Sequence, residues 1–128
     1  MSMEARARIL VIEDHSDVRE VVRLGLEQAG YEVVEASDSS AGLSLLHGRQ
    51  MDLVITDLCI PRRGGFPTIK ELRRKAPATK IIAISGDTVD VSYGDAPSCA
   101  EDLGAMRTLQ KPFRLPYMLE VVEEILGC

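Results

Sequence analysis

Short apolar runs alternate along the chain with segments whose apolar residues repeat at helical spacing. Four runs are rich in β-branched residues and a fifth is weaker, at residues 9–12, 33–34, 53–55, 81–84 and 106–109. Continuous apolar runs of this length are typical of strands buried on both faces. Strands that alternate with helices pair in parallel through right-handed crossovers. The pattern therefore predicts an α/β fold in which helices cover both faces of a parallel sheet.

The segments between the runs predict the helices. Residues 18–29 form an amphipathic stretch followed by Gly30, which suits a left-handed C-cap. Asp38 or Ser39 can cap a second helix, which is expected to end at Gly48. Two further helices are expected over about 67–75 and over 115–126.

The fourth βα unit departs from this pattern. Residues 86–97 include two glycines, one proline and three aspartates, which favour a loop. Only residues 98–103 are compatible with a short helix, with Ser98 as its cap. We therefore expect an atypical fourth unit that contains a long loop.

Length and composition favour one soluble domain over residues 1–128. The net charge of −5 argues against a general nucleic-acid binder, because phosphate contacts require surplus positive charge. The longest apolar runs are far shorter than the ~20 residues that span a bilayer, so no membrane association is expected. Three cysteines without a C-x-x-C pair suit a reducing compartment, and a cytoplasmic location is expected.

Chemically useful side chains directly follow the apolar runs. Glu13 and Asp14 come after the first run, Asp57 after the third, Ser85 after the fourth and Lys111 after the fifth. In an open α/β sheet, ligands bind beyond the carboxyl ends of the strands. A single polar residue at a strand end is most simply explained by contact with water. Five such residues at one edge predict a site instead.

These side chains suit phosphoryl transfer. Three neighbouring carboxylates repel one another unless a cation joins them, and a hard divalent ion such as Mg²⁺ is the natural partner. The Lys111 ammonium and the Ser85 hydroxyl can both bind an anionic oxygen. A metal, a lysine and a hydroxyl around one carboxylate supply the charge neutralisation that phosphoryl transfer needs. Asp57 is the expected nucleophile and would form an aspartyl phosphate.

Several motifs occur in a characteristic order. They are Val-Ile-Glu-Asp with Arg19 five residues after Asp14, Thr-Asp-Leu-Cys-Ile-Pro followed by Gly64-Gly65, Ile-Ser-Gly, Gly104-Ala105 and Gln-Lys-Pro-Phe. From about residue 8 to residue 126 the chain resembles the receiver domain of two-component response regulators, in particular the single-domain, chemotaxis-regulator-like members.

This resemblance implies a flavodoxin-like, doubly wound sheet of five parallel strands in the order 2-1-3-4-5. It implies that Glu13 and Asp14 are the acid pair that binds Mg²⁺. Asp57 and the backbone carbonyl of Cys59 would complete the protein ligands of the metal.

The resemblance also implies a signalling function. Asp57 would accept the phosphoryl group from a phosphohistidine on a histidine kinase or a histidine phosphotransfer protein. Lys111 would neutralise the phosphoryl oxygens, and Ser85 would be the switch hydroxyl that changes the binding of a downstream protein. The domain would catalyse only its own phosphorylation and dephosphorylation, and so would not be an enzyme that acts on another substrate.

Two departures from the family pattern concern the switch. Thr108 stands three residues before Lys111, where the family usually has a tyrosine or phenylalanine that rotates. The spacing between Ser85 and Lys111 is also several residues longer than usual. We therefore expect the loop 86–97 to become ordered when Ser85 engages the phosphoryl group, in place of an aromatic rotation.

An alternative function is a receiver-fold interaction module that docks partners without a phosphorylation switch. The five site residues favour phosphorylation, whereas Thr108 and the altered fourth unit favour this alternative. A hydrolase is a more distant possibility, because the residue two after Asp57 is Cys59 and not a second carboxylate. His15, Ser16 and Asp17 are adjacent in the chain and cannot form a convergent catalytic triad.

Overall fold

The computed structural model describes residues 7–46, 50–57, 65–85, 106–110 and 113–127. Strands and helices alternate within these ranges, in the order β1 (Arg8–Ile12), α1 (Ser16–Gln28), β2 (Glu32–Ala36), α2 (Ser39–Leu45), β3 (Leu53–Asp57), α3 (Gly65–Lys75), β4 (Lys80–Ser85), β5 (Arg107–Gln110) and α5 (Leu115–Leu126). The predicted fourth unit, including the loop 86–97 and the short helix 98–103, lies outside the described residues.

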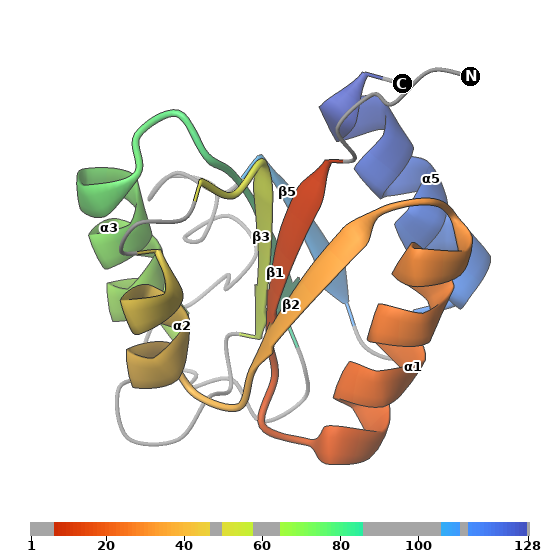
Figure 1. The fold of residues 1–128 in the computed structure, drawn as a ribbon, viewed down its shortest axis with the longest axis horizontal. Coiled ribbons are helices and arrows are strands. Elements are labelled where there is room, and N and C mark those ends of the chain that lie inside the picture. Colours follow the sequence, from red (N-terminus) through yellow and green to blue (C-terminus); the bar gives the residue numbers. More distant parts are fainter. Residues whose placement is uncertain (1–6, 47–49, 58–64, 86–105, 111–112, 128) are drawn as a thin grey trace.

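The five strands form one parallel sheet in the order β2-β1-β3-β4-β5. Helices α1 and α5 cover one face of this sheet, and α2 and α3 cover the other (Figure 1). The predicted flavodoxin-like fold and its strand order are therefore confirmed. The order in which the chain adds strands to the sheet reverses between β1 and β3, and a ligand site is expected at this point of a doubly wound fold.

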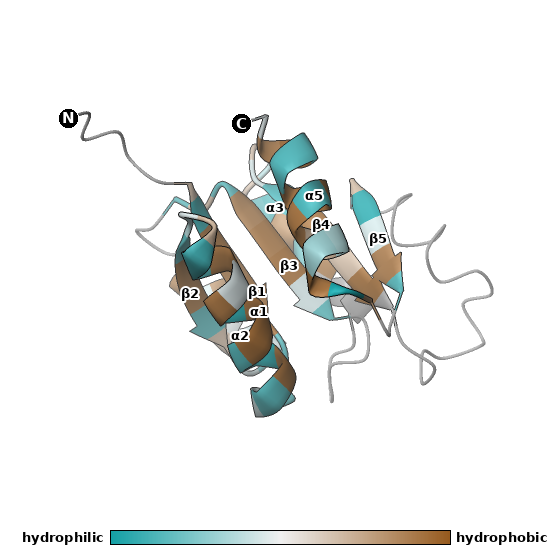
Figure 2. Ribbon diagram, turned by 90° about the vertical axis from the view of Figure 1, so that its right-hand side faces the viewer, coloured by the Kyte–Doolittle hydropathy of each residue, from teal (hydrophilic) through white to brown (hydrophobic). Residues whose placement is uncertain are grey.

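Alternate residues of the central strands point to opposite faces of the sheet. In β1, Ile9 and Val11 join the apolar cluster under α1 and α5, whereas Leu10 and Ile12 join the cluster under α2 and α3. The central strands are accordingly hydrophobic along most of their length (Figure 2). The edge strand β2 differs, because Glu32 and Glu35 are exposed on it.

Local signals set the helix boundaries close to the predicted positions. The Asp38 side chain accepts a hydrogen bond of 2.8 Å from the backbone N–H of Ala41, so Asp38 is the cap of α2. Gly30 follows α1 with φ of 101°, a left-handed conformation that suits glycine. Helix α2 ends at Leu45, earlier than predicted, and Gly48 lies outside the described residues.

Polar strand ends make the observed strands longer than the apolar runs. Asp57 and Ser85 are the last residues of β3 and β4, and Asp57 pairs with Ile84 in the ladder. Their main chains are thus held by the sheet itself. The backbone of a strand holds a functional residue more rigidly than a following loop would.

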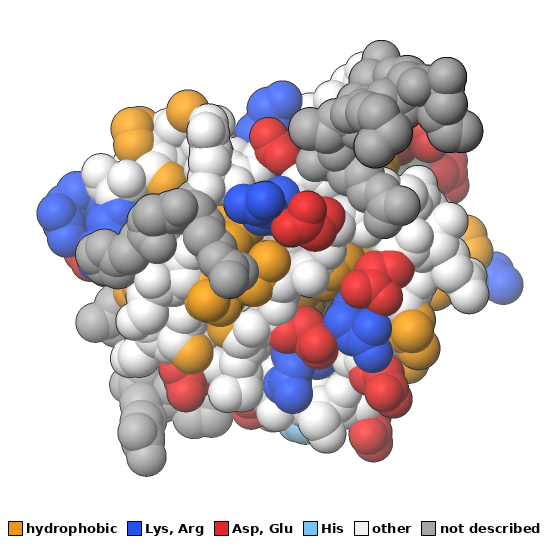
Figure 3. Space-filling model, viewed as in Figure 1, with side chains coloured by type: hydrophobic (Ala, Val, Ile, Leu, Met, Phe, Trp, Pro, Cys, Tyr) orange, Lys and Arg blue, Asp and Glu red, His pale blue; other side chains and the backbone are white. Residues whose placement is uncertain are grey.

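Charged side chains are distributed unevenly on the surface. Acidic and basic side chains are interleaved over α1 and β2, whereas basic side chains gather around α3 (Figure 3). The last turn of α3 carries Arg73, Arg74 and Lys75, and Arg74 pairs with Glu71 on the same helix. Among the described residues, no helix combines the length and the apolar character needed to cross a bilayer.

Candidate functional site

Glu13 and Asp57 lie side by side at the carboxyl edge of the sheet. Glu13 directly follows β1, and Asp57 ends β3, which pairs with β1. The Glu13 side chain is 2% exposed and Asp57 is fully buried. The structure therefore brings together two of the predicted carboxylates, in a place where neither is solvated by bulk water.

Burial and the neighbouring Asp57 carboxyl favour the protonated form of Glu13. Burial raises the pKa of Glu13, and a hydrogen bond with the Asp57 carboxyl raises that pKa further. The backbone N–H of His15 and its ring act in the opposite direction and lower the pKa of Glu13. A hydrogen bond between two carboxyl groups requires one proton, because an ionised carboxylate only accepts. The raised pKa therefore favours the protonated form of Glu13 over its usual range when no cation is bound.

Asp14 presents an oxygen without a hydrogen-bond partner. Its Oδ1 is shielded from solvent and accepts no hydrogen bond from the described residues, although Nδ1 of His15 lies 3.3 Å away. The Asp14 side chain as a whole is 27% exposed. Buried polar atoms are rarely left unsatisfied in proteins, so an unpaired carboxylate oxygen in this position suits a ligand that the protein itself does not provide.

His15 completes a group of potential metal ligands. One ligand atom each of Glu13, Asp14 and His15 lie within 4.8 Å of one another. Nδ1 of His15 is 3.0 Å from Oε2 of Glu13, and the backbone N–H of His15 donates to the same oxygen over 3.0 Å. The adjacency of His15 to Ser16 and Asp17 excludes a triad, and the contact of His15 with Glu13 is not predicted from the sequence. Its position directly after two acids was the available signal.

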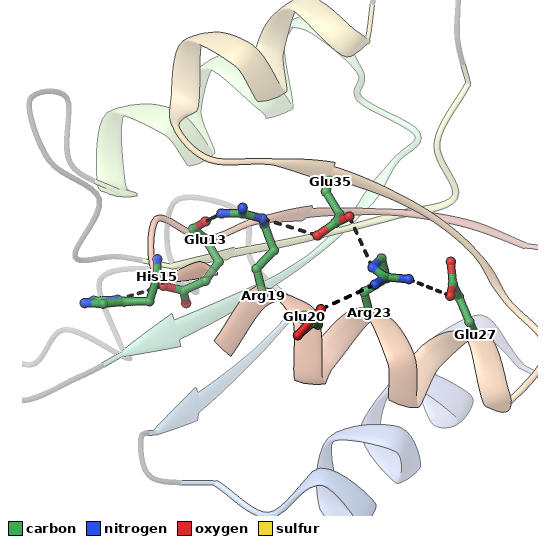
Figure 4. A network of polar contacts seen from close by, with 7 residues as sticks. All are labelled: Glu13, His15, Arg19, Glu20, Arg23, Glu27 and Glu35. Carbon is green, nitrogen blue, oxygen red and sulfur yellow. Dashed lines mark hydrogen bonds and ion pairs between the residues drawn. The ribbon is translucent and has the colours of Figure 1, made fainter. Parts of the chain in front are cut away.

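Arg19 contacts the same turn from helix α1. Its Nη1 donates a hydrogen bond of 2.7 Å to the backbone carbonyl of Glu13, and its Nε lies 3.3 Å from Oε1 of Glu35 on β2. Figure 4 shows these residues together with Arg23, which continues the network along α1. In the sequence, Arg19 stands out only as part of a motif, and its contact with Glu13 is not predicted.

The structure describes two of the other predicted site residues and leaves two undescribed. Ser85 ends β4, next to β3, so its main chain lies at the same edge of the sheet. Thr108 is a half-buried residue of β5 and pairs with Ala83. Lys111 and Cys59 lie outside the described residues. The structure thus describes an acidic group that could hold a divalent cation, and the predicted lysine is not part of that description.

The receiver domain of response regulators is the family whose model matches this chain, over residues 9–123. The chain is 34% identical over 123 residues to RpaA of Synechocystis, a DNA-binding dual master transcriptional regulator, and the match covers 93% of this chain and 48% of RpaA. It is 30% identical over 126 residues to the sensor kinase CckA of Brucella abortus, covering 97% of this chain and 13% of the kinase.

The fold comparison agrees with the sequence comparison. A response regulator receiver domain protein from Clostridium thermocellum has a TM-score of 0.84 and 28% identity, with 94% of each chain covered. The match spans less than half the length of the regulator RpaA. These matches confirm the resemblance seen in the motifs. The chain belongs to the response regulator receiver family and is a phosphoacceptor signalling domain of the two-component type.

Proposed function

We propose that Asp57 accepts a phosphoryl group from the phosphohistidine of a histidine kinase or a histidine phosphotransfer protein. The observation that carries this proposal is the buried contact between Glu13 and Asp57, with the unpaired Oδ1 of Asp14 in the same turn as Glu13. A carboxylate that is fixed at the end of a central strand and surrounded by other acids suits nucleophilic attack on phosphorus once a cation balances the charge.

The transfer forms one bond as it breaks another. A carboxylate oxygen of Asp57 attacks phosphorus, and the P–N bond to the donor imidazole breaks. The bonding electron pair stays on the imidazole nitrogen. Asp57 must be ionised for this step. A divalent cation held by the neighbouring acids would favour this charged form.

Glu13, Asp14 and Asp57 are the residues that would hold Mg²⁺, together with the backbone carbonyl of Cys59. Carboxylate and carbonyl oxygens are the ligands that Mg²⁺ prefers, and the unpaired Asp14 oxygen fits this role. When bound, the ion supplies charge neutralisation for the phosphoryl oxygens. Lys111 supplies a further positive charge, and the Ser85 hydroxyl binds the transferred group as the switch.

The signal passes to a downstream protein, and residues 1–128 act as a single cytoplasmic receiver domain. The domain catalyses only its own phosphorylation and dephosphorylation. A second candidate function is docking of a partner without a phosphorylation switch. Thr108 favours it, because this β-branched residue of β5 cannot swing between pockets as an aromatic ring does.

The test is phosphorylation by acetyl phosphate, followed by intact mass spectrometry. The wild-type protein should gain one phosphoryl group, and a chelator should prevent the gain. Asp57→Asn should abolish the adduct. Asp52→Asn is the matched control, because Asp52 is an exposed carboxylate that precedes β3 at the opposite edge of the sheet, and it should leave the adduct intact.

An adduct that persists in Asp57→Asn would show that Asp57 is not the acceptor. A folded wild-type protein that gains no phosphoryl group from acetyl phosphate or from a phosphorylated histidine donor would favour the docking function.

A further inference from the structure

We propose that Arg19 is a positioning residue that holds the main chain of the acid pair in the geometry required for cation binding. This inference rests on the proposed function, because it concerns the cation site of Glu13 and Asp14. It is carried by the 2.7 Å hydrogen bond from Nη1 of Arg19 to the carbonyl oxygen of Glu13 (Figure 4). Arg19 does not touch the reacting atoms in this arrangement and acts through the peptide that it binds.

The main chain of Glu13 is held from two sides. Its N–H donates to the carbonyl of Ala36 at the end of β2, over 3.0 Å, and its carbonyl accepts from Arg19. Because the peptide unit is planar, fixing the carbonyl of Glu13 also fixes the nitrogen and the Cα direction of Asp14. The hydrogen bond from Arg19 therefore helps to fix the backbone from which the Asp14 side chain extends.

Glu35 holds the other end of the Arg19 side chain. Nε of Arg19 lies 3.3 Å from Oε1 of Glu35, and the Arg19 side chain is only 20% exposed. A guanidinium can reach a carbonyl and a carboxylate at once, because its donors form a rigid fork, whereas a lysine ammonium lacks this fixed geometry. The contact thus links three elements, with Arg19 on α1, Glu35 on β2 and Glu13 after β1.

Arg23 offers a matched comparison one turn along the same helix. Its Nε lies 3.2 Å from Oε2 of Glu35, and its Nη1 donates to Glu27 over 2.9 Å. Arg23 therefore makes the same kind of ion pair with the same strand. In the network drawn in Figure 4, the arginine that reaches Glu13 is Arg19.

Electrostatics and positioning predict opposite effects of removing Arg19. Arg19 carries a positive charge close to a site for a cation. If its charge alone mattered, the neutral variant would bind Mg²⁺ more tightly, because a repulsive charge is lost. If Arg19 holds the Glu13 carbonyl, the neutral variant binds Mg²⁺ more weakly, because the ligands are no longer pre-arranged.

The experiment is a titration with MgCl₂, followed by the amide chemical shifts of the wild type, Arg19→Ala, Arg19→Lys and Arg23→Ala. We expect the dissociation constant to rise about tenfold in Arg19→Ala, at the lower end of the loss usual for groups that orient metal ligands. Arg23→Ala should stay close to the wild type. Arg19→Lys keeps the charge and should fall between the two, and it decides the question if Arg19→Ala does not fold.

Hydrogen exchange of the ion-free protein gives a readout that does not depend on the metal. The His15 amide donates to Oε2 of Glu13 in the wild type, so it reports the geometry of this turn. It should exchange faster in Arg19→Ala than in Arg23→Ala.

Equal or tighter Mg²⁺ binding by Arg19→Ala would overturn the proposal. The same loss in Arg23→Ala would also overturn it, because the effect would then be one of general stability. If the wild type itself does not bind Mg²⁺, the proposed function fails, and the positioning by Arg19 then stands or falls on the His15 exchange rates.

Discussion

The buried Asp57 carboxyl raises the pKa of the buried Glu13 carboxyl, although the two groups come from the ends of two different strands. Strands β1 and β3 are neighbours in the sheet, so the fold itself brings these two acids together. Two buried carboxylates in contact lower the free energy of unfolding unless a proton or a cation neutralises their charge. The stability of the domain should therefore depend both on pH and on divalent cations.

In a chelator, the free energy of unfolding should fall as the pH rises. The folded-state pKa of Glu13 is raised above its ordinary value of 4.5, so the folded protein binds more protons than the unfolded chain just above that pH. The stabilising proton is fully present below the ordinary value and is lost as the pH passes through the raised one. Urea denaturation from about pH 4.5 upward measures the fall.

Glu13→Gln is the control for this pH dependence. Glutamine keeps the shape of the side chain but does not titrate, so the slope over this range should become shallower. A slope that is unchanged in Glu13→Gln would assign the effect to other groups.

Millimolar Mg²⁺ should raise the melting temperature of the wild-type protein, because a ligand that binds only the folded state stabilises it. In Asp14→Ala the rise should shrink. The ion-free Asp14→Ala protein should be no less stable than the wild type, because Oδ1 of Asp14 accepts no hydrogen bond within the described part of the chain. Scanning calorimetry with and without MgCl₂ measures both effects.

Asp17→Ala is the matched variant for this experiment. Asp17 is an exposed carboxylate in the first turn of α1, and its removal should leave the Mg²⁺-dependent rise intact. A rise that shrinks equally in both variants would mean that the ion acts through the general negative charge of the surface.

Thr56→Val should stabilise the fold by about 1 kcal/mol. Thr56 is fully buried on β3, next to Asp57, and its hydroxyl has no hydrogen-bond partner among the residues that the structure describes. Unfolding returns this hydroxyl to water, whereas valine has the same shape and no such group. The free energy of unfolding from urea titrations measures the difference.

Thr79→Val should have the opposite effect. The Thr79 hydroxyl is also buried, but it donates a hydrogen bond of 2.9 Å to the carbonyl of Met51. Its loss should destabilise the protein by about 1 kcal/mol. Equal effects of the two substitutions would contradict the assignment of partners.

Gly42→Ala should destabilise the domain by a net amount of about 1–2 kcal/mol. Gly42 lies where α2 passes over the end of β1, and an added Cβ would approach Cδ1 of Ile12 and lie 2.8 Å from its Cγ1. The strain exceeds the gain in helix propensity from alanine. Ser44→Ala, at an exposed position of the same helix, should change the free energy of unfolding little.

Local patterns in the sequence were sufficient to predict most of the architecture. The apolar runs determine the strands because residues of that character must be buried on both faces, and this requirement does not depend on distant partners. Asp38 and Gly30 act within one turn, so their roles as helix caps could also be predicted. The meeting of Glu13 and Asp57 follows from the general rule that parallel strands end at one edge.

Only the tertiary structure decided how the main chain of Glu13 and Asp14 is held. Arg19, Glu35 and Glu13 lie on three different elements, and their contacts depend on the distance at which α1 packs on the sheet. The missing partner of Asp14 Oδ1 and the contact of His15 with Glu13 are likewise products of one backbone geometry. Sequence patterns predict which faces are buried, because the spacing of apolar residues is a property of each segment by itself. Hydrogen bonds between side chains extend over about 3 Å, and such distances are set only when the segments are packed together.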